Sequence, residues 1–121
     1  MLTDVKCRTL IVEDDPDSSD ALARLLRRVG HDVECASSAG EALVKLEEWE
    51  PDCVLLDLML PDAPGGLVLR KIRNQHLTCR VAVVTAAHEK SRILKHAVGF
   101  GPDAVFNKPI DFAKLKQWLT N

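Results

Sequence analysis

Hydrophobic positions along the chain fall into short runs of leucine and β-branched residues, which alternate with longer amphipathic stretches. Short apolar runs are typical of buried strands, and apolar residues spaced three or four apart are typical of helices that cover a sheet. We expect strands at residues 9–12, 31–36, 53–58, 81–85 and 104–107. Runs that are apolar at nearly every position favour parallel strands that are buried on both faces.

Helices are predicted between these strands, and local signals mark several of their ends. Beyond Pro16, an apolar stripe continues to residue 29 and stops at Gly30, while Ser38 and Glu41 form an S-x-x-E capping box at the start of the next helix. We expect the remaining helices at residues 67–73, 92–98 and 112–119, the last one capped by Asp111. This alternation predicts an α/β domain with a doubly wound parallel sheet and helices on both faces.

The length and composition of the chain indicate the size of the domain and the class of protein. The chain has 121 residues, of which 46% are hydrophobic and 28% are charged, with a formal net charge of -2. We expect one globular domain over residues 1–121, without direct contact to nucleic acid or to an anionic membrane. With no membrane-length apolar run and no signal-peptide pattern, we expect a cytoplasmic protein. The four cysteines form no C-x-x-C pair, which indicates reduced thiols in the core.

Polar residues stand where the predicted strands end. Glu13, Asp14 and Asp15 follow the first strand, Asp57 interrupts the third, Thr85 ends the fourth, and Lys108 follows the fifth. In an open parallel sheet, ligands bind outside the carboxyl ends of the strands. If these strands are neighbours, the carboxylates, the hydroxyl and the ammonium group converge on one crevice.

This set of residues favours phosphoryl chemistry with a hard cation. The ligand atoms are all oxygens, which suits Mg²⁺, and the metal would relieve the repulsion among the carboxylates. Asp57 lies inside an apolar run, and an aspartate can attack phosphorus and form an aspartyl phosphate. Lys108 and Thr85 would hold the phosphoryl oxygens. A cis bond between Lys108 and Pro109 could aim the lysine inward.

These motifs resemble the receiver domain of two-component response regulators, and the resemblance covers essentially the whole chain. It is carried by the acidic pair Glu13 and Asp14, by Asp57 with Pro61 and Gly65 at the expected offsets, by Thr85 followed by the small Ala86, and by Lys108 with Pro109. Each motif is weak alone, but their order and spacing together are specific.

The resemblance implies a flavodoxin-like fold with a sheet of order 2-1-3-4-5. It also implies that Asp57 accepts a phosphoryl group from a phosphohistidine on a sensor histidine kinase or a phosphotransfer protein. Asp14, Asp57 and the main-chain carbonyl of Met59 would bind Mg²⁺, and Glu13 would reach it through water. Phosphorylation would draw Thr85 inward and shift the face made by the fourth helix, fifth strand and fifth helix. Family members use this face for homodimers, and they often carry an output domain.

Three positions depart from the family pattern. Val105 stands where the family usually has a tyrosine or phenylalanine that reports the switch, although Phe106 is adjacent. Met59 and Ala87 occupy the two positions that tune loss of the phosphoryl group, and neither side chain can orient a hydrolytic water. We therefore predict a long-lived phosphoryl state.

Several alternatives remain at this stage. Asp15 is the least certain ligand, because acids after a strand also stabilise a helix N-terminus. A Mg²⁺-dependent phosphatase using Asp15 and Asp17 would need a substrate-enclosing cap for which 121 residues leave no room. A flavin carrier needs free main-chain amides where this chain has acids and Pro16. A receiver that is not phosphorylated and acts only as a docking surface has no use for Asp57, Thr85 and Lys108, so their presence argues against this alternative. We expect a signalling acceptor rather than an enzyme, either standing alone or as the N-terminal fragment of a longer regulator.

Overall fold

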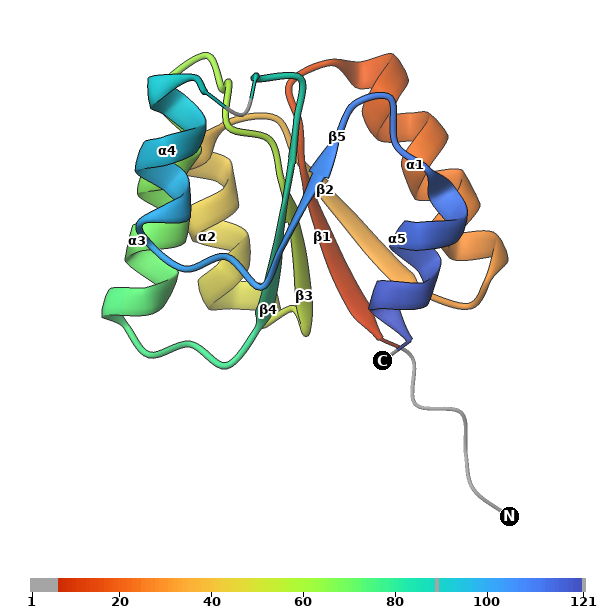
Figure 1. Cartoon of the computed structure of the whole chain (residues 1–121). Coiled ribbons are helices and arrows are strands. Elements are labelled where there is room, and N and C mark those ends of the chain that lie inside the picture. The colour runs from red at the N-terminus through yellow and green to blue at the C-terminus, as the bar shows by residue number, and fades with distance from the viewer. Residues whose placement is uncertain (1–6, 89, 121) are drawn as a thin grey trace.

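The computed structural model describes residues 7–88 and 90–120, and it contains the predicted five-stranded parallel sheet. The strands lie in the order β2-β1-β3-β4-β5, which is the order implied by the resemblance (Figure 1). Their bounds are β1 Arg8–Val12, β2 Asp32–Ala36, β3 Cys53–Leu56, β4 Arg80–Thr85 and β5 Ala104–Asn107. The α/β prediction is therefore confirmed.

In the described residues, five helices alternate with the strands and cover both faces of the sheet. They are α1 Pro16–Arg28, α2 Ala39–Trp49, α3 Gly66–Asn74, α4 Arg92–Val98 and α5 Phe112–Leu119. Helices α1 and α5 lie on one face, and α2, α3 and α4 lie on the other (Figure 1). In the described part of the chain, no helix is both long enough and apolar enough to cross a membrane.

The sheet separates two apolar clusters, because successive side chains of a strand point to opposite faces. Leu10, Val12 and Leu56 point toward α2, α3 and α4, whereas Ile11 and Leu55 point toward α1 and α5. All five side chains are at most 2% exposed. Both faces of the central strands are thus covered, which explains their unbroken apolar sequence.

The register of the strands brings their carboxyl ends together. Val12 pairs with Leu56 of β3 and with Ala36 of β2, so β1 and β3 end side by side. The Asp57 N–H still donates to the Val12 carbonyl at 2.9 Å. The residues that follow β1 and β3 therefore adjoin at this edge of the sheet.

Two local predictions were partly wrong. The third strand ends at Leu56 rather than at residue 58, because the Leu58 carbonyl accepts from Gly65 of its own loop at 2.8 Å and not from a neighbouring strand. The capping box of α2 is only half formed. Ser38 accepts from the Glu41 N–H at 3.1 Å, but the Glu41 carboxylate accepts from the N–H and hydroxyl of Ser37. The Asp111 cap of α5 is present.

The four cysteines are free thiols, as predicted. Cys53 and Cys79 are buried, and Cys7 and Cys35 are half-buried. Burial raises the pKa of the Cys53 thiol to about 12, and the adjacent Cys7 adds to this effect. The Cys53 thiol is therefore protonated at neutral pH and acts as a small apolar core group.

Candidate functional site

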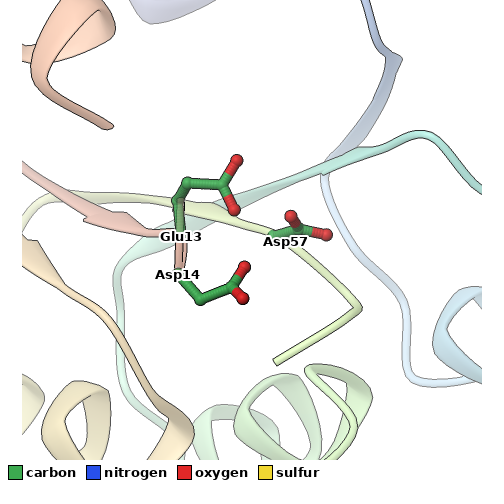
Figure 2. Close-up of side chains that lie close together, drawn as sticks. All are labelled: Glu13, Asp14 and Asp57. Carbon is green, nitrogen blue, oxygen red and sulfur yellow. The ribbon is translucent and has the colours of Figure 1, made fainter. Parts of the chain in front are cut away.

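Three carboxylates meet where β1 and β3 end. Glu13 and Asp14 follow β1, Asp57 follows β3, and each offers an oxygen within 4.8 Å of the others (Figure 2). Glu13 and Asp57 are buried, whereas Asp14 is exposed. Hydrogen bonds from Glu13 N–H to the Ala36 carbonyl and from Asp57 N–H to the Val12 carbonyl hold the main chain at these positions. The predicted acidic cluster is therefore present at the carboxyl edge of the sheet.

Lys108 supplies the positive charge of the site. Its Nζ donates to Asp57 Oδ2 at 2.8 Å and to Glu13 Oε1 at 2.6 Å. The lysine follows β5, and its main-chain N–H donates to the Thr85 carbonyl at 2.9 Å, so the ends of β4 and β5 are tied together. The Lys108–Pro109 peptide bond is cis. One ammonium group thus bridges two buried carboxylates.

The pKa values of the site follow from burial and from these contacts. Desolvation by burial raises the pKa of the Glu13 carboxyl, and the nearby Asp57 adds to this rise while Lys108 opposes it. Burial alone would lower the pKa of Lys108, but its hydrogen bonds to Asp57 and Glu13 together outweigh burial and raise it. Lys108 therefore stays protonated at neutral pH.

The acidic cluster fits a divalent cation by its chemistry. Glu13, Asp14 and Asp57 offer hard oxygen atoms, and these suit Mg²⁺, which is bound by a few carboxylates and keeps several waters. The exposed Asp14 leaves room for those waters on the solvent side. Lys108 balances part of the negative charge. A cation would add to that balance rather than create an excess of positive charge.

Asp57 is buried, yet it is accessible from one side. The side chain is 9% exposed and lies on the wall of a cavity of about 540 Å³ between α1 and α5. Leu22, Leu25 and Phe112 form much of the apolar wall, and Lys108 lies at the same end as Asp57. The carboxylate is therefore largely shielded from water, and it borders this cavity.

The loop after Asp57 contains three further predicted residues. The Met59 N–H donates to Asp57 Oδ1 at 3.1 Å, and Met59 forms an isolated antiparallel bridge with Pro64. Pro61 is exposed in this loop, and Gly65 precedes α3. The Met59 side chain is 52% exposed. The main chain of Met59 thus lies against the Asp57 carboxylate, and its side chain faces solvent.

Thr85 is close to the cluster in the fold but is bonded elsewhere. It ends β4 with 0% exposure, and its hydroxyl accepts from the Ala87 N–H at 3.0 Å. Within residues 7–88 and 90–120, the hydrogen bonds to the Asp57 carboxylate come from Met59 and Lys108, and none comes from Thr85. Ala86 is exposed next to Thr85.

Asp15 has a structural role in this arrangement. It is the N-cap of α1, and its carboxylate accepts from the Ser18 N–H at 3.3 Å. Hydrogen bonds with Ser18 lower the pKa of Asp15. Asp15 is not part of the three-carboxylate cluster. The contacts of Asp15 therefore agree with the alternative interpretation, in which this acid stabilises the N-terminus of a helix.

Val105 and Phe106 point to opposite faces of β5. Val105 is 39% exposed and lines a surface groove with Leu94 and Val98 of α4. Phe106 packs edge-to-face on Trp118 of α5, with ring centroids 6.1 Å apart. The aromatic ring beside Val105 is therefore held on the α5 side and does not occupy the α4 side.

The ion pair between Glu13 and Lys108 was not predicted. The predicted contact of Glu13 is to Mg²⁺ through water, and that of Lys108 is to the phosphoryl oxygens. These two residues are 95 positions apart, so no local pattern indicates their contact. Only the order of the strands, with β1 and β5 both near β3 and β4, indicates that the two side chains can meet.

Comparison with known proteins identifies a matching family. Residues 9–120 match the family described as the response regulator receiver domain. The chain is 30% identical over 115 residues to the probable C4-dicarboxylate response regulator DctR of Halalkalibacterium halodurans. It is 37% identical over 112 residues to a cyclic di-GMP phosphodiesterase of Thermotoga maritima. Each match covers 93% of this chain, but it covers only 50% of the first relative and 30% of the second.

A solved structure supports the same relationship. The CheY-like response regulator receiver domain of Methanospirillum hungatei superposes with a TM-score of 0.89 at 29% identity. The superposition covers 96% of this chain and 92% of that one. The similarity therefore extends over nearly the whole chain.

Proposed function

The chain belongs to the response regulator receiver domain family, and on this premise we propose that Asp57 accepts a phosphoryl group from a phosphohistidine. The main support is the placement of Asp57. Its buried carboxylate lies 2.8 Å from the Lys108 ammonium, shares a cluster with Glu13 and Asp14, and is open to a cavity beside α1. The donor would be a sensor histidine kinase or a phosphotransfer protein.

The transfer is a displacement at phosphorus. An Asp57 oxygen forms the new P–O bond while the P–N bond of the phosphohistidine breaks. The electron pair of that bond goes to the imidazole nitrogen, which takes up a proton from solvent. Lys108 is positioned to turn from the carboxylates to the phosphoryl oxygens and to donate a charge-assisted hydrogen bond there. In this proposal the hydroxyl of Thr85 and the main chain at Ala86 complete the binding of the phosphoryl group.

We assign Mg²⁺ to the acidic cluster. Asp14, Asp57 and the Met59 carbonyl would hold it directly, and Glu13 would hold it through water. A bound Mg²⁺ supplies positive charge that lowers the repulsion between the carboxylates and the incoming phosphoryl oxygens. The chain itself holds the Asp57 carboxylate beside Lys108 and shields it from water.

Removal of the metal is the first test of this function. We expect the wild-type chain to gain one phosphoryl group by intact mass when it is incubated with acetyl phosphate and Mg²⁺. With EDTA in place of Mg²⁺ the gain should be lost, because three carboxylates then face the donor with Lys108 alone to balance them. An equal gain in EDTA would contradict the metal assignment.

Lys108 gives a second test. Replacing Lys108 by methionine should slow phosphorylation by acetyl phosphate by about 10²- to 10³-fold, the usual cost of losing one donor to a developing negative charge. The rate is measured by the growth of the phosphorylated mass with time. The variant Lys116→Met removes an exposed lysine of α5 and should keep the wild-type rate. Equal rates in both variants would exclude the proposed role of Lys108.

The lifetime of the phosphoryl group is a third test. We expect slow loss, because the side chain of Met59 cannot orient a water. The Met59→Gln variant should lose the group faster, by up to about 10²-fold, the low end of the effect of a positioned polar group. Val44→Gln is the matched control, since Val44 is 50% exposed on α2 and Met59 is 52% exposed. If Met59→Gln decays at the wild-type rate, the prediction fails.

We propose that the α4–β5–α5 face changes conformation on phosphorylation and passes the signal to the next partner. Val98 and Val105 expose apolar side chains there, at 50% and 39%. These residues fit a surface that a second copy of the chain or an output domain covers in the phosphorylated state. We propose one receiver domain in a cytoplasmic signalling protein, which catalyses its own phosphotransfer and slow dephosphorylation and turns over no separate substrate.

A further inference from the structure

We propose that Asp62 is a positioning residue for the phosphoacceptor site, because its carboxylate fastens the loop after Asp57 to the first turn of α2. This inference rests on the proposed function, since the loop matters through Met59 and Asp57. Asp62 Oδ1 accepts from the Ala39 N–H at 2.8 Å, and Oδ2 accepts from the Gly40 N–H at 2.9 Å. The two residues of each pair are more than 20 positions apart in the sequence.

The contact completes the N-terminus of α2. The first main-chain N–H groups of a helix have no partner within the helix. In α2, Asp62 accepts from Ala39 and Gly40, and Ser38 Oγ accepts from Glu41. The hydrogen bonds to Gly40 and Ala39 lower the pKa of Asp62. A charged carboxylate from another loop therefore serves as part of the cap.

The other hydrogen bonds of this loop are made within it or with residues next to it in the sequence. Met59 forms a bridge with Pro64, and the Gly65 N–H donates to the Leu58 carbonyl at 2.8 Å. Among residues that the structure describes, the Pro64 carbonyl accepts from the Leu67 N–H of the following helix α3 at 3.0 Å. The hydrogen bonds from residues 59–64 to an element that is not adjacent in the sequence come from Asp62. Asp62 thus fixes the loop relative to the rest of the domain.

The position of the loop bears directly on the site. The Met59 N–H donates to Asp57 Oδ1, and Met59 lies only three residues before Asp62. Its carbonyl is one of the three direct ligands in the proposed Mg²⁺ site. Without the contact to α2, residues 59–64 gain freedom, and the carbonyl must be ordered when the metal binds. Asp62 is therefore expected to set the affinity for Mg²⁺ without touching the ion.

The test compares Mg²⁺ binding in three variants and in the wild-type chain without a phosphoryl donor. Isothermal titration calorimetry with MgCl₂ should give a dissociation constant about tenfold higher for Asp62→Ala, the low end of the effect of residues that support metal ligands. Asp62→Asn keeps one acceptor oxygen and should lie between Asp62→Ala and the wild type. Asp103→Asn is the matched control, because Asp103 also accepts a main-chain N–H, from Val81 at 2.7 Å, at the opposite edge of the sheet.

Hydrogen exchange shows whether Asp62 positions the metal site or only caps α2. Faster exchange of the Ala39 and Gly40 amides is expected in both Asp62 variants, because their acceptor is lost or weakened. If exchange is faster but the Mg²⁺ dissociation constant is unchanged, Asp62 only caps α2 and the proposal is wrong. An equal shift in Asp103→Asn would also overturn it. Should Asp62→Ala fail to fold, Asp62→Asn decides by the same two readouts.

The phosphorylation rate distinguishes this proposal from the proposed function. With acetyl phosphate, Asp62→Ala should need about ten times more Mg²⁺ for half of its maximal rate, and Asp62→Asn should need an intermediate amount. Their rate at saturating Mg²⁺ should approach that of the wild type. If the wild-type chain is never phosphorylated, the proposed function fails, whereas the calorimetric comparison still tests Asp62.

Discussion

The Asp57→Ala variant should gain no phosphoryl group from acetyl phosphate and Mg²⁺ under conditions in which the wild-type chain gains one. The substitution removes the attacking oxygen, and neither Glu13 nor Asp14 can replace it. Glu13 is bonded to Lys108 at 2.6 Å, and Asp14 is exposed at the solvent side of the cluster. Intact mass spectrometry reads the result directly, because one phosphoryl group changes the mass of the whole chain.

The variant is expected to stay folded. Removing Asp57 takes one carboxylate from a crowded buried cluster and leaves Lys108 paired with Glu13. The matched control is Asp20→Ala, which removes an exposed carboxylate of α1 and should be phosphorylated like the wild type. Circular dichroism checks both folds. If folded Asp57→Ala gains the same mass as the wild type, the acceptor is a different residue.

The Gly65→Ala variant should be destabilised by about 3 kcal/mol, at the upper end of the usual cost of overpacking. A Cβ at Gly65 would lie 2.8 Å from the Leu58 Cα and 3.0 Å from the Asp57 carbonyl carbon, and closer still to the Asp57 carbonyl oxygen. All of these atoms belong to the main chain, so no flexible side chain can move away. The melting temperature should fall by roughly 10 °C.

Gly66→Ala provides the control for this prediction. A Cβ at Gly66 would meet His96 at 3.4 Å and Ala97 at 3.7 Å, which are ordinary contacts, and alanine is a better helix former than glycine. Gly66→Ala should therefore keep the wild-type melting temperature or raise it slightly. Thermal unfolding followed by circular dichroism compares the two variants. A melting temperature of Gly65→Ala equal to that of Gly66→Ala would show that the loop adjusts freely.

Much of the fold could be predicted because the apolar pattern is set by burial. Residues 9–12, 53–56 and 81–84 lie on strands that are covered on both faces, so nearly every position is apolar. The Asp111 cap of α5 depends on contacts within a few residues, and it was predicted correctly. The site residues could be located because parallel strands end at one edge.

The contacts between distant residues could not be predicted. Glu13 meets Lys108 across 95 positions, and Asp62 meets α2 across more than 20. Neither contact has a periodic signal, because each depends on how loops pack after the sheet has formed. Even the local Ser38–Glu41 pattern was misleading, since the Glu41 carboxylate accepts from Ser37. Sequence patterns thus located the residues that meet at the carboxyl edge of the sheet more reliably than their hydrogen bonds.

Chemical mapping of the phosphoryl group tests the central claim most directly. The wild-type chain is incubated with acetyl phosphate and Mg²⁺, reduced with borohydride, which converts an aspartyl phosphate to homoserine, and digested for tandem mass spectrometry. We predict homoserine at position 57 and aspartate unchanged at positions 14 and 15. Homoserine at another position, or a mass gain that resists borohydride, would contradict the assignment of Asp57 as the phosphoacceptor.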